Sequence, residues 1–213
     1  MAKLKILIIP VTPFQQNCSL VIDEDTKLAA VVDPGGDVDR IMAAVAEAGV
    51  KIERILLTHG HIDHAGGAAE LAEKLRVKVE GPHINDKPFL DNLPARGLAY
   101  GMAGVRMVTP DRWLKEGDEV KVGGLKFSVI EAPGHSPGSV VMFNAENKFA
   151  LMGDVLFQNS VGRTDLAGGD AATLLKSIKE KILPLGDDVV FLPGHGAGSR
   201  IGTERLHNPY LKD

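Results

Sequence analysis

The chain has 213 residues, of which 44% are hydrophobic and 24% charged, and its formal net charge is −4. This composition excludes a disordered or collagen-like chain, and the slight negative charge excludes a strong general attraction to nucleic acid or to anionic membranes. The single cysteine excludes an internal disulfide, and no apolar run approaches the length of a membrane span. We therefore expect one cytoplasmic domain over residues 1–213, without a nucleic-acid or membrane partner.

The first half of the chain predicts strands that alternate with helices. Short apolar runs predict strands over residues 3–9, 17–22, 28–32, 52–58 and 77–79. Helical periodicity predicts helices over residues 37–48, with Asp37 as the N-terminal cap and Gly49 as the stop, and over residues 68–75. Prolines then interrupt residues 81–112, which predicts a helix-containing connection over the surface.

The second half predicts more strands and one further helix. Strands are expected within residues 113–132 and over 140–143, 149–152 and 189–192, with a helix over 171–182 that Asp170 caps. The residues after His195 have no predicted element. Two sheets packed face to face with helices outside would accommodate this order, so we expect an α/β fold.

The densest group of chemically active side chains is His59-Gly-His61-Ile-Asp63-His64, which follows the predicted strand 52–58. In an extended chain His59, His61 and Asp63 would share one face, and the chain would turn at Asp63-His64 to begin the next helix. Imidazole with carboxylate is a ligand set that suits zinc, iron or manganese. The alternative is a run of solvated polar loop residues.

Three further residues occupy similar positions, because His135, Asp154 and His195 each follow an apolar strand and have glycine beside them. Glycine permits sharp turns and close backbone approach. One such histidine would more often be a simple turn residue. Three of them, together with the dense cluster, indicate a metal site.

This order of motifs resembles the metallo-β-lactamase superfamily, which implies a four-layer αββα sandwich with metals at the sheet edge. Carried across position by position, the resemblance implies two divalent metal ions, zinc first, with iron or manganese possible. The first ion would bind His59, His61 and His135, and the second would bind Asp63, His64 and His195. Asp154 would bridge both ions, a hydroxide between them would attack a carbonyl, and Asp63 would orient that hydroxide.

Further motifs resemble the hydroxyacylglutathione hydrolase (glyoxalase II) group within that superfamily. They are Phe14-Gln-Gln-Asn-Cys18, Thr58-His-Gly-His61, Gly153-Asp-Val-Leu-Phe157, Gly162-Arg-Thr-Asp165 and Glu204-Arg-Leu-His-Asn-Pro209, the last two resembling a short bacterial subgroup. Arg163 is a tentative substrate-binding residue, or else forms a local ion pair with Asp165. Full-length members carry glutathione contacts in a helical C-terminal domain that we do not find here. We therefore expect tolerance of changes in the thiol portion.

The resemblance implies a thioesterase acting on S-(2-hydroxyacyl)glutathione, with S-D-lactoylglutathione as the candidate substrate. The alternatives are a persulfide dioxygenase, whose single iron would bind His59, His135 and Asp154, and a binding or redox-partner module without turnover. We expect His83 to be a surface histidine and His207 to be structural. The sequence leaves the metal, the acyl group and the oligomeric state open.

Overall fold

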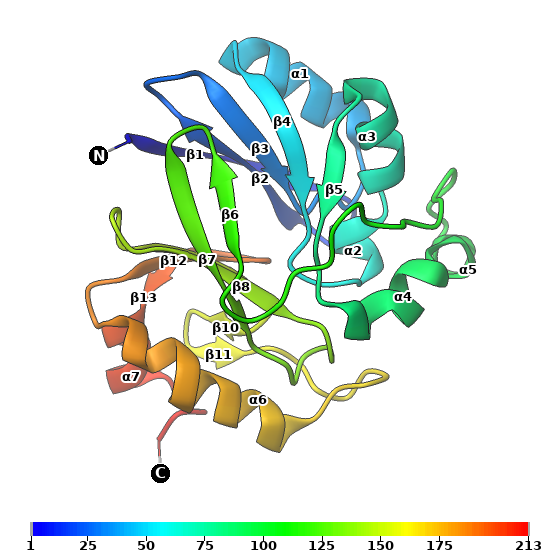
Figure 1. Ribbon diagram of the computed structural model, residues 1–213. Coiled ribbons are helices and arrows are strands. Elements are labelled where there is room, and N and C mark those ends of the chain that lie inside the picture. Colours follow the sequence, from blue (N-terminus) through cyan, green and yellow to red (C-terminus); the bar gives the residue numbers. More distant parts are fainter. Residues whose placement is uncertain (1, 213) are drawn as a thin grey trace.

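The computed structural model describes residues 2–212, and its strands form two large sheets that face each other (Figure 1). The first sheet has the order β1-β2-β3-β4-β5 and consists of β1 (Leu4–Val11), β2 (Gln16–Asp23), β3 (Leu28–Val32), β4 (Lys51–Leu56) and β5 (Lys78–Glu80). The second has the order β13-β12-β9-β8-β7-β6 and consists of β6 (Glu119–Val122), β7 (Leu125–Glu131), β8 (Val140–Asn144), β9 (Phe149–Gly153), β12 (Val190–Pro193) and β13 (Ser199–Arg200). Strands β3, β4 and β5 run parallel, as do β9 and β12.

Helices cover the outer face of each sheet (Figure 1). Helices α1 (Val38–Ala48) and α3 (Ala68–Leu75) place Ile41 and Leu71 against the first sheet. Helices α6 (Ala171–Ser177) and α7 (Ile201–His207) place Leu174 and Ile201 against the second. The predicted α/β fold with four αββα layers is confirmed.

A third group of buried side chains fills the space between the two sheets. Val21, Val32 and Leu56 of the first sheet belong to one cluster with Phe127 and Met142 of the second. Strand β3 is consequently apolar on both faces, which explains why it is a continuous apolar run in the sequence.

Most predicted elements are confirmed, and their bounds shift by a residue or two. Asp170 caps α6 as predicted, because its carboxylate accepts a hydrogen bond from the Thr173 N–H at 2.7 Å. Asp37 occupies the N-cap position of α1 as predicted, but its side chain makes no capping hydrogen bond to the helix and accepts one from the Thr12 N–H instead. Beyond α6 the helix continues through a π-helical stretch, Ile178–Ile182, and a 3₁₀ turn, Leu183–Leu185.

Several short elements are absent from the sequence prediction. They are α2 (Ile62–Ala65), the hairpin β10 (Leu156–Phe157) and β11 (Ser160–Val161), and the tail elements β13 and α7. The connection over residues 81–112 contains helices, as expected: a 3₁₀ turn (Ile84–Asp86), α4 (Lys87–Asp91) and α5 (Leu93–Ala99). In residues 2–212, no helix combines the length and apolarity that crossing a membrane requires.

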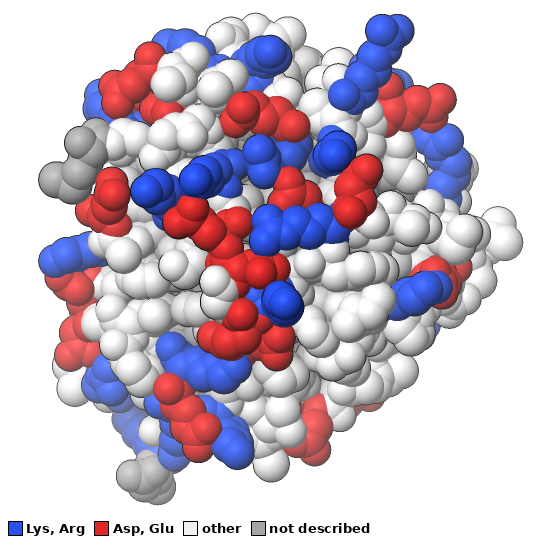
Figure 2. All heavy atoms as spheres, in the orientation of Figure 1, with Lys and Arg blue, Asp and Glu red and all other residues white. Residues whose placement is uncertain are grey.

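Charged side chains of both signs are interspersed over the face shown in Figure 2, and neither sign forms an extended area of its own there.

Candidate metal centre

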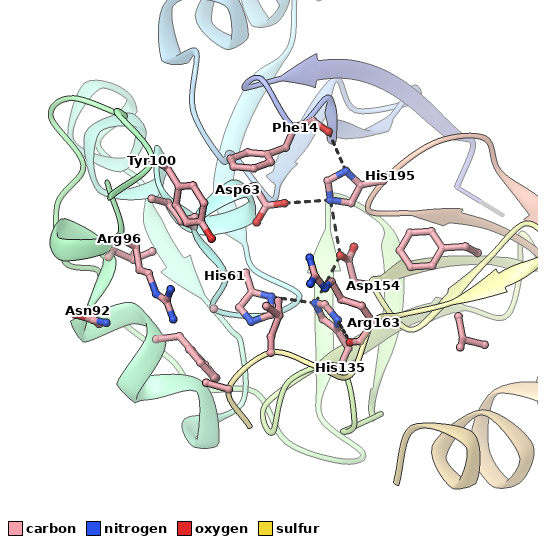
Figure 3. Close-up of a pocket in the computed structure, with 18 of the residues that line it drawn as sticks. Phe14, His61, Asp63, Asn92, Arg96, Tyr100, His135, Asp154, Arg163 and His195 are labelled. Carbon is pink, nitrogen blue, oxygen red and sulfur yellow. Dashed lines mark hydrogen bonds and ion pairs between the residues drawn. The ribbon is translucent and has the colours of Figure 1, made fainter. Parts of the chain in front are cut away.

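The seven predicted ligand residues come together at one end of the sandwich, where the loops after β4, β7, β9 and β12 meet. Figure 3 shows His61, Asp63, His135, Asp154 and His195 of this group. Hydrogen bonds join the two sheets at this end. The Asn17 N–H donates to Gly194 O at 2.7 Å, its side-chain amide donates to Pro193 O at 3.0 Å, and the Val140 N–H donates to Thr58 O at 2.9 Å. Residues far apart in the sequence are thereby held in one cluster.

The extended-chain interpretation of the first motif is wrong. Strand β4 ends at Leu56, and the helical turn α2 begins at Ile62 with His61 as its N-terminal flanking residue. Asp63 therefore projects from a helix and not from the strand face that we expected for it. The helical turn directs Asp63 toward His195, with 3.1 Å between Asp63 Oδ2 and His195 Nε2.

The first half of the cluster consists of histidines. His59, His61 and His135 each offer a ring nitrogen, and these nitrogens lie within 4.8 Å of one another. Burial, together with the neighbouring His135 and His64, lowers the pKa of His61 to about 4. Burial also lowers the pKa of His59 well below its usual value. Neutral imidazoles are the form that binds metal ions, so His59 and His61 are already in the ligating state at neutral pH.

The second half of the cluster contains carboxylates. Asp63, His64 and His195 also offer ligand atoms within 4.8 Å of one another. Burial alone would lower the pKa of His64, but the carboxylates of Asp154, Asp63 and Asp33 outweigh it and raise the pKa well above its usual value. Negative charge thus gathers on this side, which favours a cation there.

Asp154 lies between the two halves. Its Oδ1 is 3.4 Å from His64 Nε2, and its Oδ2 is 3.6 Å from His135 Nε2 and 3.7 Å from His195 Nε2. One carboxylate therefore reaches nitrogens of both groups, which is the position a bridging ligand would occupy.

Hydrogen bonds behind three of the histidines fix which nitrogen faces the centre. The Nδ1 of His64 faces Asp33 Oδ2 at 2.9 Å, that of His135 faces the Arg163 carbonyl at 2.8 Å, and that of His195 faces the Phe14 carbonyl at 3.2 Å. Because carbonyl and carboxylate oxygens only accept, Nδ1 carries the hydrogen in each ring. Nε2 therefore faces the centre in each ring, as metal-binding histidines require, and a bound metal ion would displace any proton that it carries.

Two supporting aspartates escaped the sequence reasoning. Asp33 accepts from the Thr58 N–H at 2.7 Å and from its hydroxyl at 2.6 Å, besides His64. Asp86 accepts from the Gly60 N–H at 2.8 Å and the Gly138 N–H at 2.6 Å, and so joins the two histidine-bearing loops. Asp33 follows a strand and precedes glycines, so the rule used for Asp154 could have found it. Asp86 lies in the irregular connection, where no comparable signal exists.

Unsatisfied buried atoms test whether the cluster fits a metal. Among the described residues, the buried side-chain atoms without a hydrogen-bond partner include His59 Nε2, His64 Nε2 and Asp154 Oδ1. Such atoms are rare in folded proteins and require an explanation. All three belong to the same cluster and are nitrogen or oxygen donors, a donor set that zinc, iron or manganese accepts. The residues present therefore fit bound metal.

Position 194 must be glycine because the side chains of Asp154 and His64 approach its backbone closely. A β-carbon there would lie 2.1 Å from Asp154 Oδ1 and 2.5 Å from His64 Cε1, closer than van der Waals contact allows. The glycine beside His195 thus serves close approach, as the sequence indicated.

A cavity of about 470 Å³ opens above the cluster. His61, Asp63, His135, Asp154 and His195 form its polar floor, and most of the remaining lining is apolar. Two aromatic contacts shape its walls: Phe14 meets Tyr100 edge to face at 5.5 Å between ring centroids, and Phe89 meets His61 at 5.2 Å. An apolar cavity with a few convergent polar groups is the usual form of a small-molecule site.

The structure places the remaining motif residues outside the cluster. Arg163 lines the cavity, but its guanidinium donates to both oxygens of Asp165, at 2.8 and 2.7 Å, so the local ion pair is present. Its role in substrate binding stays a prediction. His83 is half-buried, lies 3.6 Å from Glu131 and belongs to none of the three-residue metal groupings. His207 is exposed at the end of α7.

The closing motif is structural support for the loop that carries Arg163. The buried carboxylate of Glu204 accepts from the Asn159 N–H at 2.8 Å and from the Asn208 amide at 2.9 Å. Asn208 also donates to Ser160 O at 2.9 Å. Helix α7 therefore holds the β10–β11 hairpin, which leads directly into the cavity wall.

Comparisons with known proteins identify relatives of the whole chain. The family model described as metallo-beta-lactamase superfamily matches residues 11–195. Hydroxyacylglutathione hydrolase GloC of Haemophilus influenzae is 43% identical over 209 residues, 98% of each chain. The solved structure of the B3 metallo-beta-lactamase BLEG-1 is 36% identical, with a TM-score of 0.89 over 98% of this chain and 100% of that one. TTHA1623, solved in a di-iron-bound form, is 35% identical, with a TM-score of 0.86 over 96% and 100%.

Proposed function

The chain belongs to the metallo-beta-lactamase superfamily and is a metal-dependent hydrolase, and from that premise we propose that it is a glyoxalase II-like thioesterase. Its substrates would be S-(2-hydroxyacyl)glutathione thioesters, with S-D-lactoylglutathione as the candidate, and its products glutathione and a 2-hydroxy acid. The observation that carries the proposal is the convergence of seven ligand-type side chains at the base of an apolar cavity. Five of them form its floor, and His59 and His64 are fully buried. The name of the relative from Haemophilus influenzae supports the substrate class.

We assign two divalent ions to the cluster. His59, His61 and His135 would hold the first, Asp63, His64 and His195 the second, and Asp154 would lie between them. Zinc is our first choice, with iron or manganese as alternatives, because the same nitrogen and oxygen donors suit all three. Three protein ligands per ion leave positions open, which distinguishes catalytic sites from structural ones.

When bound, the ions would supply a water molecule of lowered pKa and would polarise the thioester carbonyl. The residues of the chain do the rest. The cavity walls exclude bulk water and place the carbonyl over the cluster. The carboxylate of Asp63 is partly exposed to the cavity and can hold the proton released by the attacking water. A thiol has a pKa near 8.5, so the leaving thiolate departs without a dedicated general acid.

Metal analysis combined with three assays tests the proposal. Purified protein loaded with zinc, iron or manganese should bind about two equivalents, because six ligand side chains plus a bridge exceed the needs of one ion. S-D-lactoylglutathione should be hydrolysed, while a chromogenic β-lactam should not. If the protein binds a single iron firmly and consumes oxygen with a persulfide substrate, the thioesterase proposal is wrong and the protein is a dioxygenase. Hydrolysis of the β-lactam alone would assign the site to lactams.

A further inference from the structure

Helix α5 and its two flanking residues present three polar side chains to the cavity. Asn92 before the helix, Arg96 within it and Tyr100 after it all line the cavity, and they follow one another at intervals of four residues. Residues four apart lie on the same face of a helix. Gly97 is buried on the other side, where a β-carbon would meet Val105 at 2.9 Å. Close packing behind the helix therefore holds the three polar side chains toward the cavity.

The guanidinium of Arg96 has no hydrogen-bond or ion-pair partner within residues 2–212. The other arginine on the cavity wall differs, because both oxygens of Asp165 occupy Arg163. Figure 3 shows the Arg96 guanidinium and the Tyr100 hydroxyl turned toward the cavity, with Arg163 on the opposite wall near His135. The cavity thus contains one cation whose donors are free for a ligand.

The size of the cavity leaves room for more than an acyl group. Its volume of about 470 Å³ falls within the range of sites that enclose whole small molecules. A lactoyl group over the metal cluster would fill only a small part of that space. Whatever carries the thiol must occupy the remainder, and Arg96 borders that remainder together with the apolar side chains of Phe89 and Leu93.

We propose that Arg96 binds a carboxylate of the thiol portion of the substrate, with the Asn92 amide and the Tyr100 hydroxyl as further donors. This inference rests on the proposed thioesterase function, whose thiol product is an anionic peptide. A guanidinium offers a planar fork of N–H donors that matches a carboxylate. From the sequence we expected the enzyme to tolerate changes in the thiol portion of the substrate. The polar side chains of α5 and its flanking residues lead us to expect that the enzyme distinguishes between thiols.

Kinetics of the metal-loaded enzyme on two substrates test the assignment. Arg96→Ala should raise KM for S-D-lactoylglutathione by about 10- to 100-fold, the loss expected for a hydrogen-bonded charge pair. Its kcat should change less than about threefold, because Arg96 lies away from the reacting carbonyl. The S-lactoyl ester of N-acetylcysteamine has no carboxylate, so its KM should not change. Tyr100→Phe keeps the edge contact to Phe14 and should raise only the first KM, by a few-fold.

Arg40→Ala is the matched control. Arg40 is an exposed arginine on α1 and does not line the cavity above the cluster. Arg40→Ala and Arg96→Ala change the net charge by the same amount. A comparison of the two variants therefore separates loss of a local contact from a general electrostatic effect. The assignment fails if Arg96→Ala raises KM for both thioesters equally, or if Arg96→Ala and Arg40→Ala have the same effect.

Direct binding keeps this inference separate from the proposed reaction. S-methylglutathione cannot be hydrolysed, so its dissociation constant can be measured by calorimetry whether or not the enzyme turns thioesters over. Wild type should bind it about tenfold or more tightly than Arg96→Ala, and conversion of its carboxylates to ethyl esters should abolish that difference. Equal affinity of wild type and Arg96→Ala would overturn the role of Arg96. Absence of thioester hydrolysis in wild type would overturn the proposed function alone.

Discussion

Buried carboxylates at the two ends of the β-sandwich differ in how fully they are hydrogen-bonded. At the end away from the cavity, Asp23 is almost fully buried and both its oxygens accept hydrogen bonds. The donors are the Gly124 N–H at 2.8 Å, the Thr26 hydroxyl at 2.8 Å and the Asp25 N–H at 3.0 Å. At the cavity end, Asp154 keeps an oxygen without any hydrogen-bond partner.

Both ends nevertheless join the same two sheets. Asp23 at the end of β2 and Glu53 in β4 reach the Gly123-Gly124 turn of the second sheet, while Asn17 and Thr58 make the corresponding links at the cavity end. The difference shows where the chain places its unsatisfied groups. The far end contributes stability, and the cavity end keeps lone pairs that only a bound cation would satisfy.

The largest effect is expected from Asp154→Ala. If Asp154 lies between two ions, its loss should remove metal from both positions. A bound metal ion lowers the pKa of water from about 15.7 to about 7, so kcat/KM should fall at least about 10³-fold. The metal-free variant should unfold at a Tm no lower than that of the metal-free wild type, because an unsatisfied buried carboxylate is itself unfavourable. Metal analysis and calorimetry measure the two quantities.

A variant that keeps its two metal equivalents would remove Asp154 from the bridging position. A large drop in Tm without metal would mean that the cavity end also supports the fold, and the contrast between the ends would disappear.

The next largest effect is expected from Asp63→Asn. The amide keeps the shape of the side chain but loses its charge, so it can no longer hold the released proton. We expect kcat to fall by about 10²-fold, with a smaller rise in KM, because the lost interaction acts mainly in the transition state. Steady-state kinetics at saturating metal measure both constants. An unchanged kcat would exclude Asp63 from the reaction.

An intermediate effect is expected from Asp33→Asn. The amide NH2 group would replace one accepting oxygen, so it would place a donor against the N–H and hydroxyl donors of Thr58 or the ring N–H of His64. Loss of such a supporting partner typically weakens metal affinity by about 10- to 100-fold. Asp37→Asn is the matched control, since Asp37 lies in the same loop and its carboxylate binds only the Thr12 N–H among the described residues. Equal metal affinities in the two variants would contradict the supporting role of Asp33.

The sequence predicted the proposed metal ligands better than the residues that direct and support them, because each ligand is marked by the sequence immediately around it. Each proposed ligand follows an apolar strand and has glycine nearby, so strand ends alone locate His135, Asp154 and His195. The helical turn that directs Asp63 is only four residues long and leaves no periodicity to detect. Asp86 and Arg96 act through contacts between segments far apart in the chain, and these contacts exist only after folding.

A smaller effect, confined to stability, is expected from Asp23→Asn at the far end. Partial desolvation raises the pKa of Asp23, but hydrogen bonds from Gly124, Thr26 and Asp25 outweigh it and lower the pKa below its usual value. The ionised carboxylate therefore stabilises the fold above the unfolded pKa of about 3.9, and this contribution is lost as pH falls through the folded value. Asp23→Asn should cost about 1–3 kcal/mol at pH 7, and this cost should shrink as pH falls through the folded pKa. Denaturant unfolding at pH 7 and at a series of lower pH values measures it, and kcat should not change.

The smallest effect is expected from His83→Ala, which separates position from function at the cavity end. The backbone N–H of His83 donates to Gly138 O at 3.1 Å, so the residue touches the loop that carries His135. Its ring, however, lies near Glu131 and accepts from the Asn85 N–H at 3.3 Å, away from the cluster. Alanine keeps the backbone contact and removes a weak cap and a partly exposed ion pair, together worth less than about 1 kcal/mol. Metal content and kcat/KM should therefore match wild type within about twofold, because neither quantity depends on the lost contacts. Loss of a metal equivalent in this variant would show that the ligand set includes a histidine that the geometry places outside it.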